Sequence, residues 1–187
     1  MDQFALDFQA LTKNDAGNGH VPLGWQRRLF QLFCQNVVPT VCDLPTGLGK
    51  TSIIHLWLLA LRYQIRERKP RLPTRLVYVV DRRTVVDQAT MVAEGIKRNL
   101  QSLQMEGNWL SVSTLRGKFA DNREWTIDPS RPAIVIGTVD MIGSRLLFNG
   151  YRSSYKMRPL DAGLLGQDTL VVLDEAHLSE PFAKLIA

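Results

Sequence analysis

Short apolar runs alternate along the chain with longer stretches of helical periodicity. None of the apolar runs alternates with polar residues, which is typical of strands buried on both faces of a parallel sheet. The pattern predicts strands at residues 38–43, 76–80, 110–114, 133–137 and 169–174. It predicts helices at residues 25–36, 50–68, 84–100 and 139–148. We therefore expect an α/β fold in which helices cover both faces of a parallel sheet.

Two other stretches are interpreted as surface features. Residues 116–131 contain the dipeptide Asp128-Pro129 and end at Arg131, which precedes Pro132, so they are predicted to form a loop. A basic cluster follows the second predicted helix, and we expect a solvated helix end there rather than a nucleic-acid patch. Its members are Arg62, Arg66, Arg68, Lys69, Arg71 and Arg75. The Trp and Phe residues do not alternate with Lys and Arg as in a base-stacking platform, so we expect them in the core.

Composition narrows the class of protein. The 187 residues are 45% hydrophobic and 22% charged, which is typical of a soluble globular chain with one sizeable core. The net charge of +5 favours a polyanionic partner without deciding one. Two cysteines, Cys34 and Cys42, cannot build a disulfide framework or a four-cysteine zinc site, and they suit a reducing cytoplasm. The acidic N-terminus and the short apolar run at 53–61 exclude a signal peptide and membrane insertion.

The most informative segment is DLPTGLGKT at residues 43–51, between a predicted strand and a predicted helix. A turn there aims backbone N–H groups and a helix N-terminus at one point, which suits phosphate oxygens. Gly47 and Gly49 allow positive φ and leave room for phosphate to approach the backbone. Lys50 is predicted to contact the β- and γ-phosphates, and the Thr51 hydroxyl to ligate Mg²⁺.

One residue of this segment departs from the generic phosphate-loop pattern. That pattern has Gly or Ala where the chain has Leu44. The alternative interpretation is an ordinary turn between a strand and a helix. A tight Gly-x-Gly-Lys-Thr string rarely arises by chance in this context, so nucleotide binding is favoured.

A second informative segment joins four apolar residues, 170–173, to Asp174 and Glu175. Residues just past the carboxyl end of a parallel strand lie at the ligand crevice. Asp174 is predicted to hold Mg²⁺ through its water shell, and Glu175 to orient or deprotonate the attacking water. Taken alone, such a pair is usually a helix cap with a first-turn acid. Together with the phosphate loop, it predicts a nucleotide triphosphatase, and His177 could couple this site to another.

With residues 45–51 and the string Asp-Glu-Ala-His at 174–177, the chain resembles the first motor domain of a superfamily 2 helicase of the DEAH-box type. The resemblance implies a three-layer RecA-like P-loop NTPase fold with ATP and Mg²⁺ as cofactors. It also implies that Gln26 reads the adenine edge. The implied ATP-binding residues are Gln26, Thr46, Gly47, Leu48, Gly49, Lys50 and Thr51, with Lys50 and Glu175 as catalytic residues and Thr51 and Asp174 as metal ligands.

The same resemblance implies a track for single-stranded nucleic acid. Residues 79–84 stand in the place of helicase motif Ia, and residues 136–140 in that of a later strand-end motif. The implied DNA-contacting residues are Arg82, Arg83, Thr84, Arg116, Gly117 and Thr138. Strand-end turns and helix caps are the alternative interpretation of both segments.

Longer stretches extend the match. Residues 79–88, 137–148, 162–166 and 173–182 resemble the helicase-nuclease of type I CRISPR interference systems, of the subtype called U or G. This resemblance implies ATP-driven movement along single-stranded DNA in a prokaryotic cytoplasm. It also implies recruitment to a target that an RNA-guided surveillance complex has opened.

Parts of that activity are expected on other segments or chains. The family's nuclease uses His and Asp on metals, whereas this sequence has three histidines and no His-Asp dipeptide. We interpret residues 1–187 as an incomplete N-terminal ATP-binding domain, without the second motor domain, its arginine finger, the strand of the Ser-Ala-Thr motif or the nuclease. Alone it is expected to be nearly inactive. The alternatives are another superfamily 2 DNA or RNA motor, and a non-catalytic docking module.

Overall fold

The computed structural model describes residues 2–105, 107–115, 122–151 and 153–186. The chain divides into two compact units. We call residues 1–72 and 92–107 the helical unit, and residues 73–91 and 108–187 the sheet unit. The helix α4 (Arg83–Asn99) and the short turn η3 (Gly107–Trp109) contribute residues to both.

The helical unit is built around one apolar helix. Its elements are α1 (Gln3–Leu11), α2 (Gly24–Cys34), η1 (Lys50–Ser52), α3 (Ile53–Arg66) and η2 (Leu100–Leu103). Every residue of α3 from 54 to 61 is buried, as expected for a helix that is apolar all round. Both α1 and α2 pack on α3. The first of these helices was not predicted, although Asp2 caps it by accepting a hydrogen bond from the Ala5 N–H at 2.7 Å.

Buried polar side chains hold this unit together. The Gln64 amide donates to the Phe33 carbonyl at 2.9 Å and accepts from the Leu72 N–H at 2.9 Å. Arg62 donates to the Asp7 carboxylate at 2.7 Å and to the Leu103 carbonyl at 2.9 Å. Its side chain is only 11% exposed, so this member of the basic cluster is not part of a solvated helix end.

The strand predicted at residues 38–43 is wrong, because the structure has no strand there. Val41 is 77% exposed and Val38 is 43% exposed. A strand needs a partner for its backbone N–H and C=O groups, and the described part of the helical unit holds helices only. Pro39 further removes one N–H donor from the segment.

The sheet unit contains the parallel sheet, and the four other predicted strands are confirmed to within one residue. They are β1 (Arg75–Val80), β2 (Ser111–Leu115), β3 (Ala133–Thr138) and β4 (Thr169–Leu173). Their order is β2-β3-β1-β4, and every pair is parallel. The register places Val79 beside both Gly137 and Leu173. The carboxyl ends of β1, β3 and β4 therefore meet at one edge.

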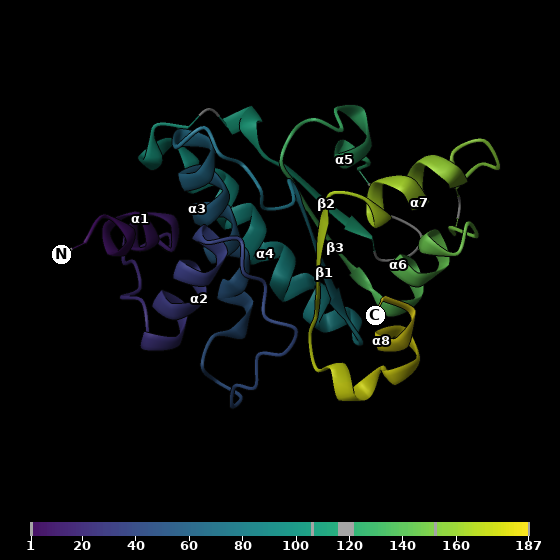
Figure 1. Cartoon of the computed structure of the whole chain (residues 1–187), viewed down its shortest axis with the longest axis horizontal. Helices are drawn as coiled ribbons and strands as arrows, with labels where there is room; N and C mark the ends of the chain where they lie inside the picture. The colour runs from purple at the N-terminus through teal and green to yellow at the C-terminus, as the bar shows by residue number, and fades with distance from the viewer. Residues whose placement is uncertain (1, 106, 116–121, 152, 187) are drawn as a thin grey trace. The chain divides into compact units, whose positions relative to one another are not determined.

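The start of α4 lies on one face of this sheet, and four helices cover the other (Figure 1). They are α5 (Glu124–Ile127), α6 (Val139–Leu146), α7 (Arg158–Gly166) and α8 (Glu180–Ile186), with the turn η4 (Ala176–Leu178). One face packs Val77, Val79 and Val135 against residues of these helices, among them Ile142, Leu165 and Phe182. On the other face, the Thr90 hydroxyl of α4 bonds that of Thr114 at 3.0 Å. Helix α5 lies within the loop predicted at 116–131, of which 116–121 fall outside the described residues.

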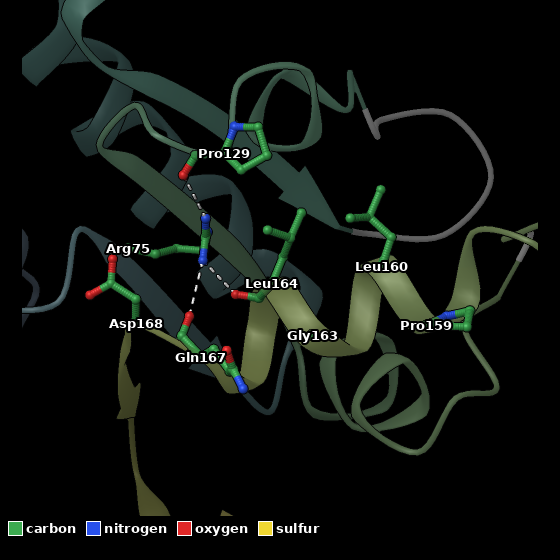
Figure 2. Close-up of a pocket in the computed structure, with 8 residues that line it drawn as sticks. All are labelled: Arg75, Pro129, Pro159, Leu160, Gly163, Leu164, Gln167 and Asp168. Atoms are coloured by element: carbon green, nitrogen blue, oxygen red, sulfur yellow. Dashed lines mark hydrogen bonds between the residues drawn. The ribbon is translucent and has the colours of Figure 1, made fainter.

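Arg75 stands at the opposite, amino edge of the sheet and is 3% exposed. Figure 2 shows its guanidinium donating to the carbonyl oxygens of Leu164 at 2.6 Å, Gln167 at 3.2 Å and Pro129 at 3.3 Å. The Arg75 guanidinium thus supplies hydrogen-bond donors to carbonyl oxygens at the end of α7. Arg75 also lines an open pocket of about 400 Å³. This second buried member of the basic cluster is structural, which again corrects the expectation of a solvated cluster.

A buried carboxylate ties α7 to its neighbours. Asp161 is 0% exposed. It accepts hydrogen bonds from the Arg123 guanidinium at 2.9 Å and from the Ser153 hydroxyl. The Arg145 Nε lies 3.8 Å from the same carboxylate, and Arg145 is 3% exposed. We call these four residues the Asp161 cluster, and it joins α6, α7 and the segments before α5 and α7.

Candidate functional site

The phosphate-loop segment lies in the helical unit with its backbone open to solvent. Gly47 has φ +86° and Gly49 has φ +68°, so both glycines adopt the left-handed conformation that other residues avoid. The backbone N–H groups of 46–49 make no hydrogen bond within the described part of the chain. Lys50 and Thr51 follow in η1, at the start of α3. Available N–H donors at a helix start fit an anionic phosphate.

Gln26, the predicted adenine reader, is 5% exposed and fastens α2 to the phosphate loop. Its Oε1 accepts from the Leu23 N–H at 2.7 Å, and its Nε2 donates to the Ser52 hydroxyl at 2.7 Å. Ser52 directly follows Thr51, so Gln26 positions the end of the loop. The contact of Gln26 with adenine stays a prediction.

Two titratable side chains flank this loop. Cys42 is an exposed residue, but its thiol group is partly buried. This partial burial raises the pKa of the thiol, and the charge of Lys50 opposes that rise. His55 lies one turn into α3, against the Phe8 ring at 5.9 Å between ring centroids. Burial is the main cause that lowers the pKa of His55 to about 4, aided by the charge of His20 and opposed by a hydrogen bond with the Ser52 backbone. His55 is therefore neutral near pH 7.

The acidic strand end lies in the sheet unit. The Asp174 N–H donates to the Val79 carbonyl at 2.9 Å, which continues the β1–β4 ladder past the end of β4. The Asp174 carboxylate accepts a hydrogen bond from the Tyr78 hydroxyl at 3.0 Å. Tyr78 was not predicted as a site residue. The available signal was a hydroxyl within the otherwise apolar part of a buried strand, because a buried hydroxyl requires a partner.

Glu175 and His177 follow in a tight turn. Glu175 has φ +51°, a left-handed conformation that is strained for a residue with a side chain. It precedes η4 but makes no side-chain capping bond there, so the helix-cap alternative gains no support. The His177 Nδ1 lies 3.6 Å from the Glu175 carboxylate, and the His177 side chain is 71% exposed. The coupling role of His177 stays a prediction.

The predicted DNA contacts divide into three groups. Arg82, Arg83 and Thr84 follow β1 and are exposed. Thr138 pairs with Val80 in the β1–β3 register, so it lies at the same sheet edge. However, Thr138 is 8% exposed and its hydroxyl accepts from the Met141 N–H at 3.4 Å, so it caps α6. The last two, Arg116 and Gly117, lie outside the described residues.

The described residues were also searched for other kinds of site. They hold no group of three or more His, Cys, Asp or Glu side chains that could bind a metal ion. Within the same residues, no helix has both the length and the apolar composition needed to cross a bilayer.

Comparison with known proteins gives one match. A family model described as DEAD/DEAH box helicase matches residues 25–182. No curated protein and no solved structure matches the chain. The matched range begins beside Gln26 and ends in α8, and it contains both the phosphate loop and the acidic strand end.

Proposed function

We propose a function on the premise that the chain belongs to the DEAD/DEAH box helicase family. The chain is thus an ATP-dependent helicase motor domain with a RecA-like fold. In this proposal, it drives a translocase on single-stranded DNA in type I CRISPR interference. The proposed motor activity is supported by the solvent-exposed phosphate loop together with Asp174 and Glu175 at the end of a strand. The CRISPR role is supported by the resemblance of residues 79–88, 137–148 and 173–182 to that system's helicase-nuclease.

In the proposed nucleotide site, each group of residues has one task. The N–H groups of 46–49 and the Lys50 ammonium bind the phosphates. The Thr51 hydroxyl and Asp174 would hold Mg²⁺, which would supply positive charge to neutralise the phosphates. Glu175 accepts the proton of the attacking water or orients that water.

Tyr78 acts through Asp174 as a positioning residue. Its hydroxyl donates to one carboxylate oxygen of Asp174, which fixes the orientation of that carboxylate, and the other oxygen would be available to help hold Mg²⁺. Because Tyr78 is 1% exposed within β1, its ring cannot swing away without opening the sheet core.

The exposed side chains after β1 form the nucleic-acid part of the proposal. Arg82 and Arg83 offer guanidinium groups to backbone phosphates at the sheet edge that carries Asp174. Phosphate contacts fix a register without reading bases, which suits movement along any sequence. The preference for DNA over RNA rests on the resemblance to the CRISPR helicase-nuclease.

The first test is ATP hydrolysis by the full-length protein, alone and with single-stranded DNA or RNA. We expect DNA to stimulate turnover and RNA not to. Stimulation by RNA alone would assign the chain to the RNA motors, and stimulation by neither would favour a docking module. Recruitment to target DNA opened by an RNA-guided complex, measured by co-purification, then tests the CRISPR role separately.

Two substitutions test the assigned residues. Lys50→Ala should abolish nucleotide binding, because the phosphates lose their one cationic side chain in the loop. Glu175→Gln should keep binding but stop hydrolysis, because the amide cannot accept the proton of water. The matched controls are Lys69→Ala and Glu67→Gln, both on exposed residues. Unchanged turnover in Lys50→Ala or in Glu175→Gln would contradict these roles.

A further inference from the structure

The connection between α6 and α7, which Figure 1 traces, carries exposed aromatic side chains. Phe148 is 58% exposed, Tyr151 is 71% exposed and Tyr155 is 84% exposed. The exposure of Phe148 corrects the expectation that the Phe residues lie in the core. Three exposed rings within eight residues differ from the singly scattered apolar side chains of an ordinary surface.

The backbone at Phe148 is held in a conformation that this residue type avoids. Its N–H donates to the Arg145 carbonyl at 3.1 Å, and the Asn149 N–H donates to the Ser144 carbonyl at 2.7 Å. These bonds make a Schellman ending of α6, in which the left-handed position is usually Gly. Phe148 occupies that position with φ +57°. A strained, bulky residue whose ring stays largely in solvent suggests a role other than stability.

Polar contacts fix the same segment from its inner side. The Ser153 N–H donates to the Gly150 carbonyl at 3.1 Å, and the Ser153 hydroxyl donates to buried Asp161. Gly150 packs so closely that an added Cβ would lie 2.8 Å from the Arg145 Cγ. Gly150 and Ser153 are therefore held in place, whereas Tyr151 and Tyr155 are exposed.

The charges of this segment favour a polyanion. Residues 147–160 contain no Asp or Glu. Lys156 directly follows Tyr155 and is exposed, and Arg158 is half-buried two residues further along the chain. The next carboxylate along the chain, Asp161, is fully buried and lies among Arg123, Arg145 and Ser153. The segment therefore has no exposed carboxylate of its own that would repel a phosphate group.

We propose that Phe148, Tyr151 and Tyr155, with Lys156, form a platform on which single-stranded nucleic acid stacks its bases. Exposed rings beside cationic side chains are how proteins hold single strands without reading sequence. The platform follows α6, whose eight residues span about 12 Å from Thr138 at the sheet edge. A strand bound at that edge can therefore reach it within a few nucleotides. This proposal rests on the proposed motor function.

A protein partner is the competing occupant, because Tyr, Phe and Arg are also enriched in protein interfaces. The absence of carboxylates from the segment and the nucleic-acid substrate of the helicase family favour a single strand. The two occupants respond differently to substitution. Stacking needs the rings and not the hydroxyl groups, whereas Tyr residues in protein interfaces commonly use both.

The test measures binding of the full-length protein to a fluorescein-labelled oligothymidylate of about 20 nucleotides, by fluorescence anisotropy without ATP. The variant Tyr151→Ala/Tyr155→Ala should weaken binding at least about tenfold. The variant Tyr151→Phe/Tyr155→Phe should bind within about twofold of the unaltered protein, because it keeps both rings. Tyr63→Ala, which removes a ring that is 49% exposed on α3, is the matched control. Thermal unfolding checks that each variant is folded.

Salt dependence supplies a second readout. Lys156→Ala should reduce the slope of log affinity against log salt by about one, whereas the double Ala variant should leave that slope unchanged. Equal loss in the Ala and Phe variants would overturn stacking, because the hydroxyl groups would then carry the contact.

Unchanged affinity of the Ala variant would also overturn the platform. If single-stranded DNA still stimulates ATP hydrolysis in that case, the proposed function stands without it. A change in self-association or partner binding with unchanged oligonucleotide affinity would assign the surface to a protein. Failure of the unaltered protein to bind either DNA or RNA would overturn both proposals together.

Discussion

Replacing Asp161 by Asn is expected to destabilise the protein strongly. Asp161 is 0% exposed, and the substitution keeps its volume while it removes the charge that faces Arg145, which is 3% exposed. Breaking a buried ion pair by neutralising one partner costs about 3–5 kcal/mol, because the other charge then stays buried without that carboxylate. The contact with Arg123 adds little, since that side chain is 33% exposed and is screened by water. We therefore expect a loss of about 3 kcal/mol.

Urea unfolding followed by circular dichroism measures this loss. For a chain of 187 residues, about 3 kcal/mol corresponds to a fall of roughly 6–12 °C in Tm. The double variant Asp161→Asn/Arg145→Met should recover part of the lost stability, because the buried charge of Arg145 is then also removed. Asp15→Asn, on a fully exposed carboxylate, is the matched control and should stay within about 0.5 kcal/mol.

Two outcomes would refute this reasoning about the Asp161 cluster. One is a loss below about 1 kcal/mol for Asp161→Asn, which is the range of a surface ion pair. The other is a double variant that is less stable than Asp161→Asn alone, which would mean that Arg145 stabilises the fold by packing rather than by charge.

The remaining predictions concern His55 and Phe148. Burial lowers the pKa of His55 to about 4, so its contribution to stability is complete above pH ~6.5 and declines as pH falls toward 4. In urea unfolding, the free energy of unfolding of the unaltered protein should fall by about 2 kcal/mol between pH 7.5 and pH 5 because of His55. The variant His55→Leu should lack that fall. Equal pH profiles of the two proteins would contradict the prediction. Phe148→Gly should be about 1 kcal/mol more stable than Phe148→Ala in the same assay, the reverse of the usual order, because φ is +57°. An Ala variant at least as stable as Gly would show that the position is not strained.

The strands β1, β3 and β4 of the sheet unit were predictable because each is a short, mostly apolar run. In β3, residues 133–137 were predicted and 133–138 are observed, since Thr138 completes the ladder before it caps α6. The acidic strand end was placed correctly at the end of β4. These features depend on local sequence and on burial, which a hydrophobic pattern reports directly.

What escaped prediction depends on partners distant in sequence. Residues 38–43 have strand composition but no neighbouring strand in the described part of their unit, and composition cannot supply one. The contact of Tyr78 with Asp174 joins residues 96 positions apart, so only the sheet register brings them together. The burial of Arg75 likewise depends on carbonyl groups far along the chain.

The two thiols differ in a way that makes the protein easy to label. Cys42 is exposed immediately before Asp43 and the phosphate loop, whereas Cys34 is half-buried and its pKa is raised by burial to about 11. A thiol-reactive dye should therefore attach first at Cys42, because alkylation needs an accessible thiolate. Such a dye lies eight residues from Lys50 in the native sequence, so it can report nucleotide occupancy without an engineered cysteine.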